Sequence, residues 1–155
     1  MTDLSDLLRH DAVVAGVAVP SKKAVIAAVA ATAAGLVDGD PRDIAERLAA
    51  REKLGSTGFG LGVAIPHARL PGLATVIGVF LRLAQPVDFA AVDDLPVDLV
   101  FALLSPVEAG AEHLKALARV SRRMRDRALL AKLRGAGSRD AIYALLCQDE
   151  ARDAA

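Results

Sequence analysis

The sequence predicts an α/β domain in which a central mixed β-sheet is flanked by helices. Two observations carry this prediction. Residues 74–83 and 97–104 are apolar on both alternating faces, which is typical of central strands that helices cover on both sides. Around them, segments with apolar residues at helical spacing begin at good helix-capping residues. Because the strands and helices do not alternate strictly, we expect a mixed sheet.

The composition indicates one folded domain. The 155 residues are 54% hydrophobic and 25% charged, so the chain can bury a substantial core. We see no internal repeat and no low-complexity linker, and we expect a single domain over residues 1–155, with a core at about 4–148 and a short polar C-terminal tail. The single cysteine, Cys147, excludes an internal disulfide and a zinc site built from cysteines.

Charge and hydropathy argue against two classes of partner. Nineteen Lys and Arg residues balance nineteen Asp and Glu residues, so the chain lacks the bulk positive charge of a duplex-binding protein, and we expect no nucleic-acid partner. The longest uncharged stretch, residues 24–37, is shorter than the roughly 20 residues of a membrane-spanning helix. The N-terminus is acidic where a signal peptide would be basic. We therefore expect a cytoplasmic protein with no membrane insertion.

The first third of the chain carries clear helix and strand signals. Residues 3–9 are expected to form a short helix, and residues 13–19 a short strand or extended segment that Pro20 ends. Ser21 is a good N-cap for a helix over residues 22–36, which has one buried apolar stripe.

A second helix begins at Asp40 and Pro41, because Asp is a good N-cap and Pro suits the first helical position. It should run to about Leu54, with Gly55 as its C-terminal stop. Residues 56–62 then read as a glycine-rich turn.

The rest of the chain alternates between short extended segments and helices. A short strand is expected over residues 63–65, and Pro66 breaks it just before His67. Between the two central strands, residues 86–96 could hold a short edge strand or a hairpin. Helices are expected at about 110–124, 126–134 and 139–148, the last capped by Ser138.

Arg51 is the first residue that suggests chemistry. It follows Ile44 at i+7, so it lies on the inward face of the second helix. An inward arginine needs an anionic partner or a solvated cleft, so Arg51 is either a structural ion-pair residue or an anion clamp suited to phosphate. Ser56 and Thr57, which follow this helix, could donate to the same anion or serve only the turn.

The three histidines have different settings. His67 follows a strand and a proline, and it is equally well interpreted as a packed loop residue or as a nucleophile presented at a strand end. His113 shares a helical stripe with Val120 and Met124, which favours a core histidine, although it could reach a second histidine from the sheet. His10 lies in a polar segment and is expected at the surface.

The sequence lacks the motifs of several other kinds of site. The glycines of residues 58–62 loosely resemble a dinucleotide fingerprint, but they precede a strand instead of opening a helix. The chain has no GxxxxGK[ST], HExxH or GxSxG motif, and no third ligand accompanies His67 and His113 at a metal-binding spacing. We expect no metal and no cofactor. The basic cluster at residues 122–125 is expected to be a solvated face that could help to dock an acidic partner.

Residues 51–67 resemble the active-site segment of enzyme IIA proteins of the fructose/mannitol and nitrogen-regulatory class, which belong to the bacterial phosphoenolpyruvate-dependent phosphotransferase system. The chain departs from the family pattern at Ala68, where glycine is common, and at Leu61, where a polar residue is frequent. The resemblance covers nearly the whole chain, because it continues through residues 21–23, 86–89, 96–104 and 113–121.

The resemblance implies a fold and a site. The family fold is a central mixed sheet flanked by helices. His67 matches the histidine that accepts a phosphoryl group from the phosphohistidine of an HPr-type carrier. Arg51 matches the arginine that neutralises the phosphoryl oxygens, and His113 matches the second histidine, which orients them. Ser56 and Thr57 match the segment that lines the pocket. The chain would be an enzyme in the limited sense of a phosphohistidine relay.

Three hypotheses follow. The favoured one is a regulatory phosphocarrier of the nitrogen-related branch, whose phosphorylation state controls binding to proteins such as kinases or transporters. Two observations favour this branch. The sequence of residues 51–67 resembles it more closely, and the chain has no IIB segment or membrane domain. The alternative is a fructose- or mannitol-type IIA that passes phosphate to a IIB component for sugar uptake. A domain that only binds partners is the third, and the joint presence of Arg51, His67 and His113 argues against it.

Overall fold

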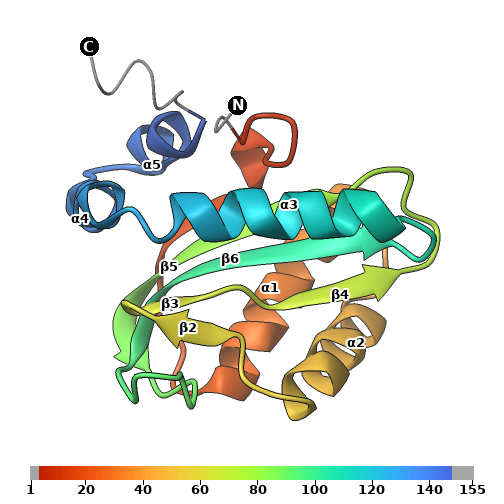
Figure 1. Cartoon of the computed structure of the whole chain (residues 1–155), viewed down its shortest axis with the longest axis horizontal. Helices are drawn as coiled ribbons and strands as arrows, with labels where there is room; N and C mark the ends of the chain where they lie inside the picture. Colours follow the sequence, from red (N-terminus) through yellow and green to blue (C-terminus); the bar gives the residue numbers. More distant parts are fainter. Residues whose placement is uncertain (1–3, 148–155) are drawn as a thin grey trace.

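The computed structural model describes residues 4–147 as one domain with a six-stranded mixed sheet and five α-helices on its two faces (Figure 1). This confirms the predicted fold class. The sheet order is β1-β5-β6-β3-β2, and β4 also pairs with β6. The strands are β1 (Val13–Val17), β2 (Gly58–Gly60), β3 (Val63–Ala64), β4 (His67–Leu70), β5 (Ile77–Val87) and β6 (Val97–Pro106).

The two longest strands form the centre of the sheet, as predicted. β5 and β6 run antiparallel, whereas β1 pairs parallel with β5, and β3 and β4 pair parallel with β6. β3 and β4 lie end to end along one side of β6, since β3 pairs with Leu99 and Val100 and β4 pairs with residues 103–106. His67 therefore stands at the start of a strand, immediately after the interruption.

Two apolar cores lie on the two faces of the sheet. Successive residues of β6 face opposite cores. Leu99, Phe101 and Leu103 belong to the first core, and Val100, Ala102 and Leu104 belong to the second. The first core is covered by α3 (Gly110–Arg123), α4 (Arg127–Gly135) and α5 (Arg139–Leu146), and the second by α1 (Lys22–Val37) and α2 (Pro41–Lys53). Figure 1 shows α3 crossing one face of the sheet and α1 lying behind it.

The predicted helix starts are confirmed by side-chain caps. Ser21 Oγ accepts a hydrogen bond from the Ala24 amide at 3.2 Å, and an Asp40 carboxylate oxygen accepts one from the Arg42 amide at 3.0 Å. Ser138 caps α5 in the same way. Each such cap stabilises its helix by about 1 kcal/mol. The caps of α1 and α2 matter for function, because α2 carries Arg51.

The helix predicted over residues 3–9 is wrong within the described residues. Residues 5–7 form a turn, and the regular element is a single 3₁₀ turn, η1 (His10–Ala12). Leu4, Leu7 and Leu8 are all buried in the first core, and the Leu7 carbonyl accepts a hydrogen bond from the Gly78 amide. The segment therefore follows a path that buries these three leucines against the sheet and ties it to β5.

The connections around the sheet also differ from the sequence prediction. Residues 56–62 are not only a turn, because they contain β2, which pairs antiparallel with β3. Residues 86–96 hold no separate edge strand; β5 ends at Val87, and residues 88–96 form the loop of the hairpin that joins β5 to β6. In that loop the carboxylates of Asp88 and Asp93 accept hydrogen bonds from the Ala90 and Leu95 amides, which competes with strand pairing.

The C-terminal region needs one correction. Within the basic cluster at residues 122–125, Arg123 is not solvated; it is fully buried and its guanidinium donates to the Leu145 carbonyl at 2.8 Å. This contact ties α3 to α5. The predicted polar tail and the last residue of the predicted helix lie outside the described residues. Within residues 4–147, no helix is both long and apolar enough to span a membrane.

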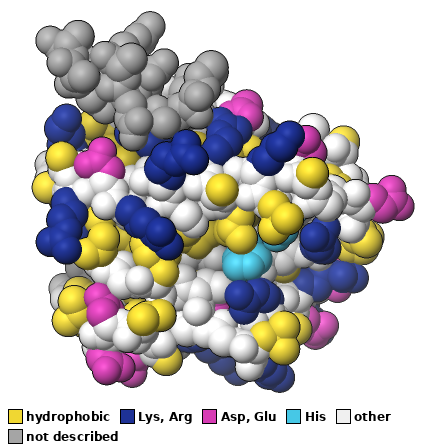
Figure 2. All heavy atoms as spheres, in the orientation of Figure 1, with side chains coloured by type: hydrophobic (Ala, Val, Ile, Leu, Met, Phe, Trp, Pro, Cys, Tyr) yellow, Lys and Arg dark blue, Asp and Glu magenta, His cyan; other side chains and the backbone are white. Residues whose placement is uncertain are grey.

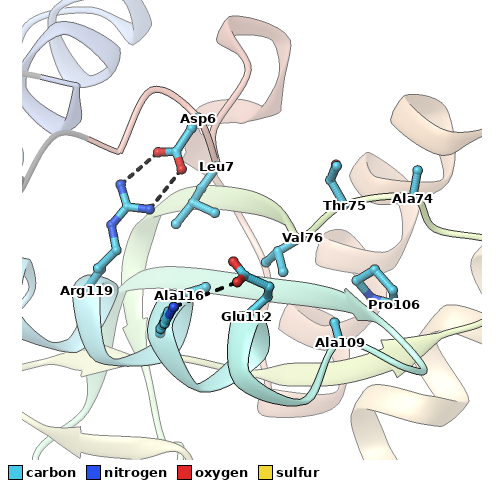
Figure 3. Close-up of a pocket in the computed structure, with 11 residues that line it drawn as sticks. Asp6, Leu7, Ala74, Thr75, Val76, Pro106, Ala109, Glu112, Ala116 and Arg119 are labelled. Carbon is cyan, nitrogen blue, oxygen red and sulfur yellow. Dashed lines mark hydrogen bonds and ion pairs between the residues drawn. The ribbon is translucent and has the colours of Figure 1, made fainter.

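An ion pair holds the N-terminal segment on α3. Both carboxylate oxygens of Asp6 contact the guanidinium of Arg119, at 2.7 and 2.8 Å (Figure 3). The hydrogen bond from Arg119 lowers the pKa of Asp6, although partial burial opposes the effect. The pair borders a pocket of about 420 Å³ between this segment, the start of β5 and α3.

Gly78 on β5 is a site where any side chain would disturb this packing. A Cβ there would lie 2.7 Å from Phe101 Cε1 and 3.2 Å from the Leu7 carbonyl oxygen. We expect Gly78→Ala to lower the free energy of unfolding by roughly 1–3 kcal/mol through overpacking. Gly35→Ala in α1 meets nothing within 4 Å and should raise it by about 0.5–1 kcal/mol. Urea denaturation measures both; equal effects of the two variants would contradict the packing argument.

Candidate functional site

Three of the five predicted site residues meet in one pocket of about 470 Å³. Arg51 comes from the last turn of α2, His67 from the start of β4, and His113 from the first turns of α3. Figure 2 shows histidine atoms at the surface with lysine or arginine atoms and apolar atoms beside them. The other residues that line the pocket are Arg47, Ala50, Leu54, Ala68 and Arg69.

The His67 ring is held by two contacts of opposite kind. Its Nδ1 lies 2.8 Å from the Ile65 carbonyl oxygen, which can only accept a hydrogen bond. Nδ1 therefore carries the ring proton. Its Nε2 lies 3.2 Å from Arg51 Nε, which donates. Nε2 is thus the unprotonated nitrogen, and its lone pair points toward the guanidinium that would neutralise an incoming anion.

The surroundings of His67 favour its neutral form. Burial lowers the pKa of His67 below 6.5, and the charge of Arg51 lowers it further, whereas the hydrogen bond to Ile65 and the charge of Glu52 act in the opposite direction. Only a neutral imidazole has a lone pair for nucleophilic attack. At neutral pH the ring is therefore ready to act as a nucleophile through Nε2.

His113 lies beside His67, and a buried serine of β6 contacts its ring. The two ring centroids are 5.6 Å apart, and His113 Nδ1 lies 2.6 Å from Ser105 Oγ on β6. This contact leaves the other nitrogen, Nε2, for an occupant of the pocket. Burial, followed by the charges of Arg69 and His67, lowers the pKa of His113. Ser105 is fully buried, and it was not among the predicted site residues.

The pocket is rich in cationic side chains. Arg51 also donates to the Gly55 carbonyl at 2.9 Å, and Arg69 donates to the Val107 carbonyl at 3.2 Å. Sequence analysis missed Arg69, although it is two residues after His67, and alternate residues of a strand share a face. Cations around a hollow attract anions. Among residues 4–147, no three His, Cys, Asp or Glu side chains gather so that they could hold a metal ion.

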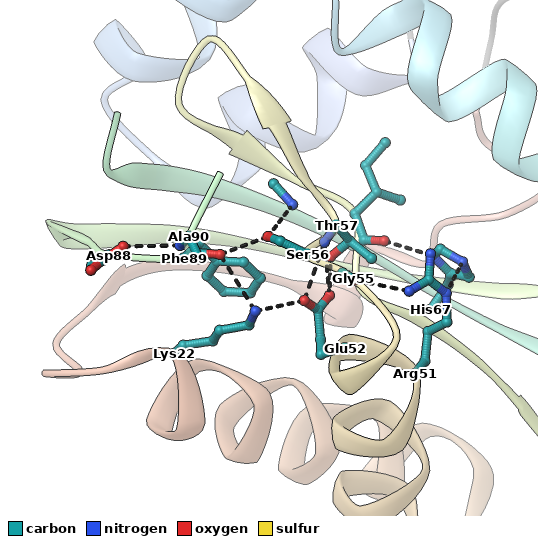
Figure 4. A network of polar contacts seen from close by, with 12 residues as sticks. Lys22, Arg51, Glu52, Gly55, Ser56, Thr57, His67, Asp88, Phe89 and Ala90 are labelled. Carbon is teal, nitrogen blue, oxygen red and sulfur yellow. Dashed lines mark hydrogen bonds and ion pairs between the residues drawn. The ribbon is translucent and has the colours of Figure 1, made fainter. Parts of the chain in front are cut away.

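Ser56 and Thr57 do not line this pocket. Ser56 Oγ donates to the Phe89 carbonyl at 2.6 Å and accepts from the Gly58 amide at 3.0 Å. The hydroxyl and amide of Thr57 both donate to the Glu52 carboxylate (Figure 4). The structure thus gives both hydroxyls other partners, and their contact with a phosphoryl group stays a prediction.

Glu52 is a buried charged residue next to Arg51 that sequence analysis missed. It is 7% exposed, and Lys22 Nζ lies 2.8 Å from its carboxylate. A signal was present, since Glu52 follows the buried Leu48 at i+4 and so lies on the same helix face. A charge on an apolar helix face needs partners, and Lys22 and Thr57 supply them.

Known proteins similar to this chain share one family and one fold. Residues 6–149 match the family described as "Phosphoenolpyruvate-dependent sugar phosphotransferase system, EIIA 2". The "Nitrogen regulatory protein" of Bradyrhizobium diazoefficiens is 48% identical over 143 residues, which cover 92% of this chain and 94% of the relative. The crystal structure of the nitrogen regulatory protein IIA-Ntr from Neisseria meningitidis matches with a TM-score of 0.86 at 36% identity, covering 91% and 97% of the two chains.

A sugar-transport protein is also similar. The "PTS system fructose-specific EIIA component" of Haloferax volcanii is 36% identical over 110 residues, which cover 70% of this chain and 71% of that protein. The similarity therefore extends to both branches of one family, with the higher identity on the nitrogen-regulatory side.

The state of the His67 ring can be measured directly. We expect ¹⁵N chemical shifts to show a protonated Nδ1 and an unprotonated Nε2 at pH 7, because the Ile65 carbonyl accepts from the ring. The ring should titrate below pH 6.5, because burial disfavours its charged form. His10, which is exposed, serves as the internal comparison. An Nε2-protonated His67 would contradict this assignment.

Proposed function

The chain belongs to the EIIA 2 family of the phosphoenolpyruvate-dependent sugar phosphotransferase system, and from this premise we propose that His67 is its phosphoryl acceptor. One observation carries the proposal. His67 presents an unprotonated Nε2 to a pocket where Arg51 and His113 face the same space. His10 also lies between an acceptor and a guanidinium, those of Asp140 and Arg139, but it is exposed and does not line this pocket.

The transfer step needs little from the protein beyond position and charge. His67 Nε2 attacks the phosphorus of a phosphohistidine on an HPr-type donor. A new N–P bond forms as the donor's N–P bond breaks, and its electron pair stays with the donor ring, which leaves as neutral imidazole when its other nitrogen is protonated. The ring proton stays on His67 Nδ1, which continues to donate its hydrogen bond to the Ile65 carbonyl. Phosphoryl transfer depends mainly on positioning and electrostatic stabilisation, which suits this pocket.

The neighbouring residues have separate roles in this proposal. Arg51 Nε–H now contacts the nucleophilic nitrogen, so it transfers its hydrogen bond to a phosphoryl oxygen as the N–P bond forms. His113, held by Ser105, donates or orients through Nε2. Arg69 adds positive charge on the same side of β4 as His67. The fold thus brings donors from two helices and one strand around a single phosphoryl group.

We propose that the output is regulatory. Two relatives that are 48% identical bear the name nitrogen regulatory protein, which supports an output through phosphorylation-dependent binding of other proteins. In this proposal the donor is an HPr-type phosphocarrier, the targets are proteins such as kinases or transporters, and the setting is the cytoplasm. The enzymatic role is confined to relaying a phosphoryl group.

A second candidate has one observation in its favour. The fructose-specific EIIA component of Haloferax volcanii is 36% identical. On this alternative, phosphorylated His67 passes its phosphoryl group to a IIB component during sugar uptake. The same pocket would serve, so only the acceptor distinguishes the two candidates.

The proposed acceptor is tested by intact-mass analysis after incubation with phosphoenolpyruvate, enzyme I and an HPr-type carrier, at neutral to alkaline pH. Wild type should gain one acid-labile phosphoryl group, and His67→Ala should gain none. Arg51→Ala should slow phosphorylation by roughly 10²–10³-fold, because a charge-stabilising donor is lost. Arg42→Ala, exposed at the other end of α2, should match wild type. Labelling of His67→Ala at the wild-type rate would contradict the assignment.

The same preparation separates the two candidate roles. Phosphorylated protein is mixed with a fructose-type IIB component, and transfer to the IIB is followed by mass. We expect no transfer on the timescale of phosphorylation by the donor. Rapid transfer would favour the sugar-uptake role over the regulatory one.

A further inference from the structure

We propose that Glu52 is a positioning residue for the phosphoryl site, and that it acts through Thr57 on both hydrogen-bond partners of His67. The inference rests on the proposed function, since it concerns the same histidine. Glu52 does not line the pocket that holds His67. Its influence runs through hydrogen bonds of the segment between α2 and His67, and Figure 4 shows Glu52, Thr57 and His67 in this network.

The Glu52 carboxylate joins the end of α2 to the segment that follows it. It accepts hydrogen bonds from the Thr57 amide, at 3.2 and 3.3 Å to its two oxygens, and from the Thr57 hydroxyl. Lys22, at the start of α1, pairs with the same carboxylate at 2.8 Å. The side chain of Glu52 is only 4% exposed. Removing one member of such a buried set leaves the others unsatisfied, so Thr57 depends on the carboxylate for its position.

One path leads from Thr57 to the protonated side of the His67 ring. The Thr57 carbonyl accepts a hydrogen bond from the Ile65 amide at 3.1 Å. The carbonyl of Ile65 then holds His67 Nδ1 at 2.8 Å. Ile65 lies in the interruption between β3 and β4, so it is placed by Thr57 instead of by a continuous strand ladder. Displacement of Thr57 would therefore loosen the contact that selects the tautomer.

A second path leads to the nucleophilic side of the ring. Gly55 lies between Glu52 and Thr57, in a loop that their hydrogen bonds close. The Gly55 carbonyl accepts from Arg51 Nη1 at 2.9 Å, while Arg51 Nε faces His67 Nε2 at 3.2 Å. A guanidinium is planar and rigid, so the position of the Gly55 carbonyl also sets where Nε points.

The charge of Glu52 also acts on His67. Its negative charge raises the pKa of His67, in opposition to burial and to Arg51. The other charged or titratable side chains around the ring are Arg47 from α2, Arg69 from β4 and His113 from α3. Substitution of Glu52 by a neutral residue should therefore lower the pKa of His67, an effect that a loss of packing alone does not require.

The experiment compares Glu52→Gln with Glu46→Gln, an exposed residue of the same helix. The rate of phosphorylation by a phosphorylated HPr-type carrier is measured as a function of pH, and the His67 ring is followed by ¹⁵N NMR. For Glu52→Gln we expect a rate on the order of 10–100-fold lower at pH 8. We also expect a lower pKa of His67 and a larger population of the Nε2-protonated tautomer. Glu46→Gln should match wild type in every measurement.

Two variants of Thr57 test the same proposal if Glu52→Gln does not fold. Thr57→Val has nearly the same shape but loses the hydroxyl that donates to Glu52, whereas Thr57→Ser retains it. Thr57→Val should slow phosphorylation and alter the tautomer population of His67, and Thr57→Ser should restore both. Wild-type rates and an unchanged His67 ring in folded Glu52→Gln or Thr57→Val would overturn the proposal.

Failure of the proposed function gives a different result. If wild type accepts no phosphoryl group, the relay is wrong, but the NMR comparison still decides whether Glu52 sets the state of the His67 ring. If wild type is phosphorylated and the ring of Glu52→Gln is unchanged, the relay stands and the role of Glu52 is wrong.

Discussion

The site depends on one constraint: the His67 ring lies between a group that only accepts hydrogen bonds and a group that only donates them. The Ile65 carbonyl requires a proton on Nδ1, and the Arg51 guanidinium requires a lone pair on Nε2. Neither partner tolerates a ring flip. An imidazole that is protonated at Nδ1 and has its Nε2 lone pair next to a cation follows from these two contacts, and the proposed transfer to Nε2 needs no separate general base.

The irregular part of the sheet makes this constraint available. The Ile65 amide donates to the Thr57 carbonyl, on the side away from β6. Its own carbonyl accepts from the histidine ring instead of from a neighbouring strand. Pro66 lacks an amide hydrogen, yet its carbonyl still accepts from the Leu103 amide at 2.9 Å, so pairing resumes at once. The sheet thus lacks one hydrogen bond at Pro66, and the Ile65 carbonyl just before it is an acceptor for the His67 ring.

The features predicted from sequence are those with a local cause. Capping residues, apolar periodicity and the inward position of Arg51 are properties of a few consecutive residues, and the central strands are visible as continuous apolar runs. The misses depend on contacts distant in the chain. β4 exists because β6 is beside it, and the path of the N-terminal segment is set by the burial of Leu4, Leu7 and Leu8 in the first core. Ser56 and Thr57 were noticed as polar residues, but their partners, Phe89 and Glu52, emerge only from the fold.

The arrangement of cations has a consequence for recognition at a distance. Arg47 is paired with Asp43, whereas Arg51 and Arg69 donate to main-chain carbonyls, so the pocket holds about two uncompensated positive charges. A bound phosphoryl dianion carries nearly the opposite charge, about −2. The local field then largely cancels, and salt screens the remainder within about 8 Å. The two forms would therefore differ by about two charges at the pocket, a difference that salt screens at longer range. A partner that discriminates between them must approach the rim, where Leu54 is 84% exposed.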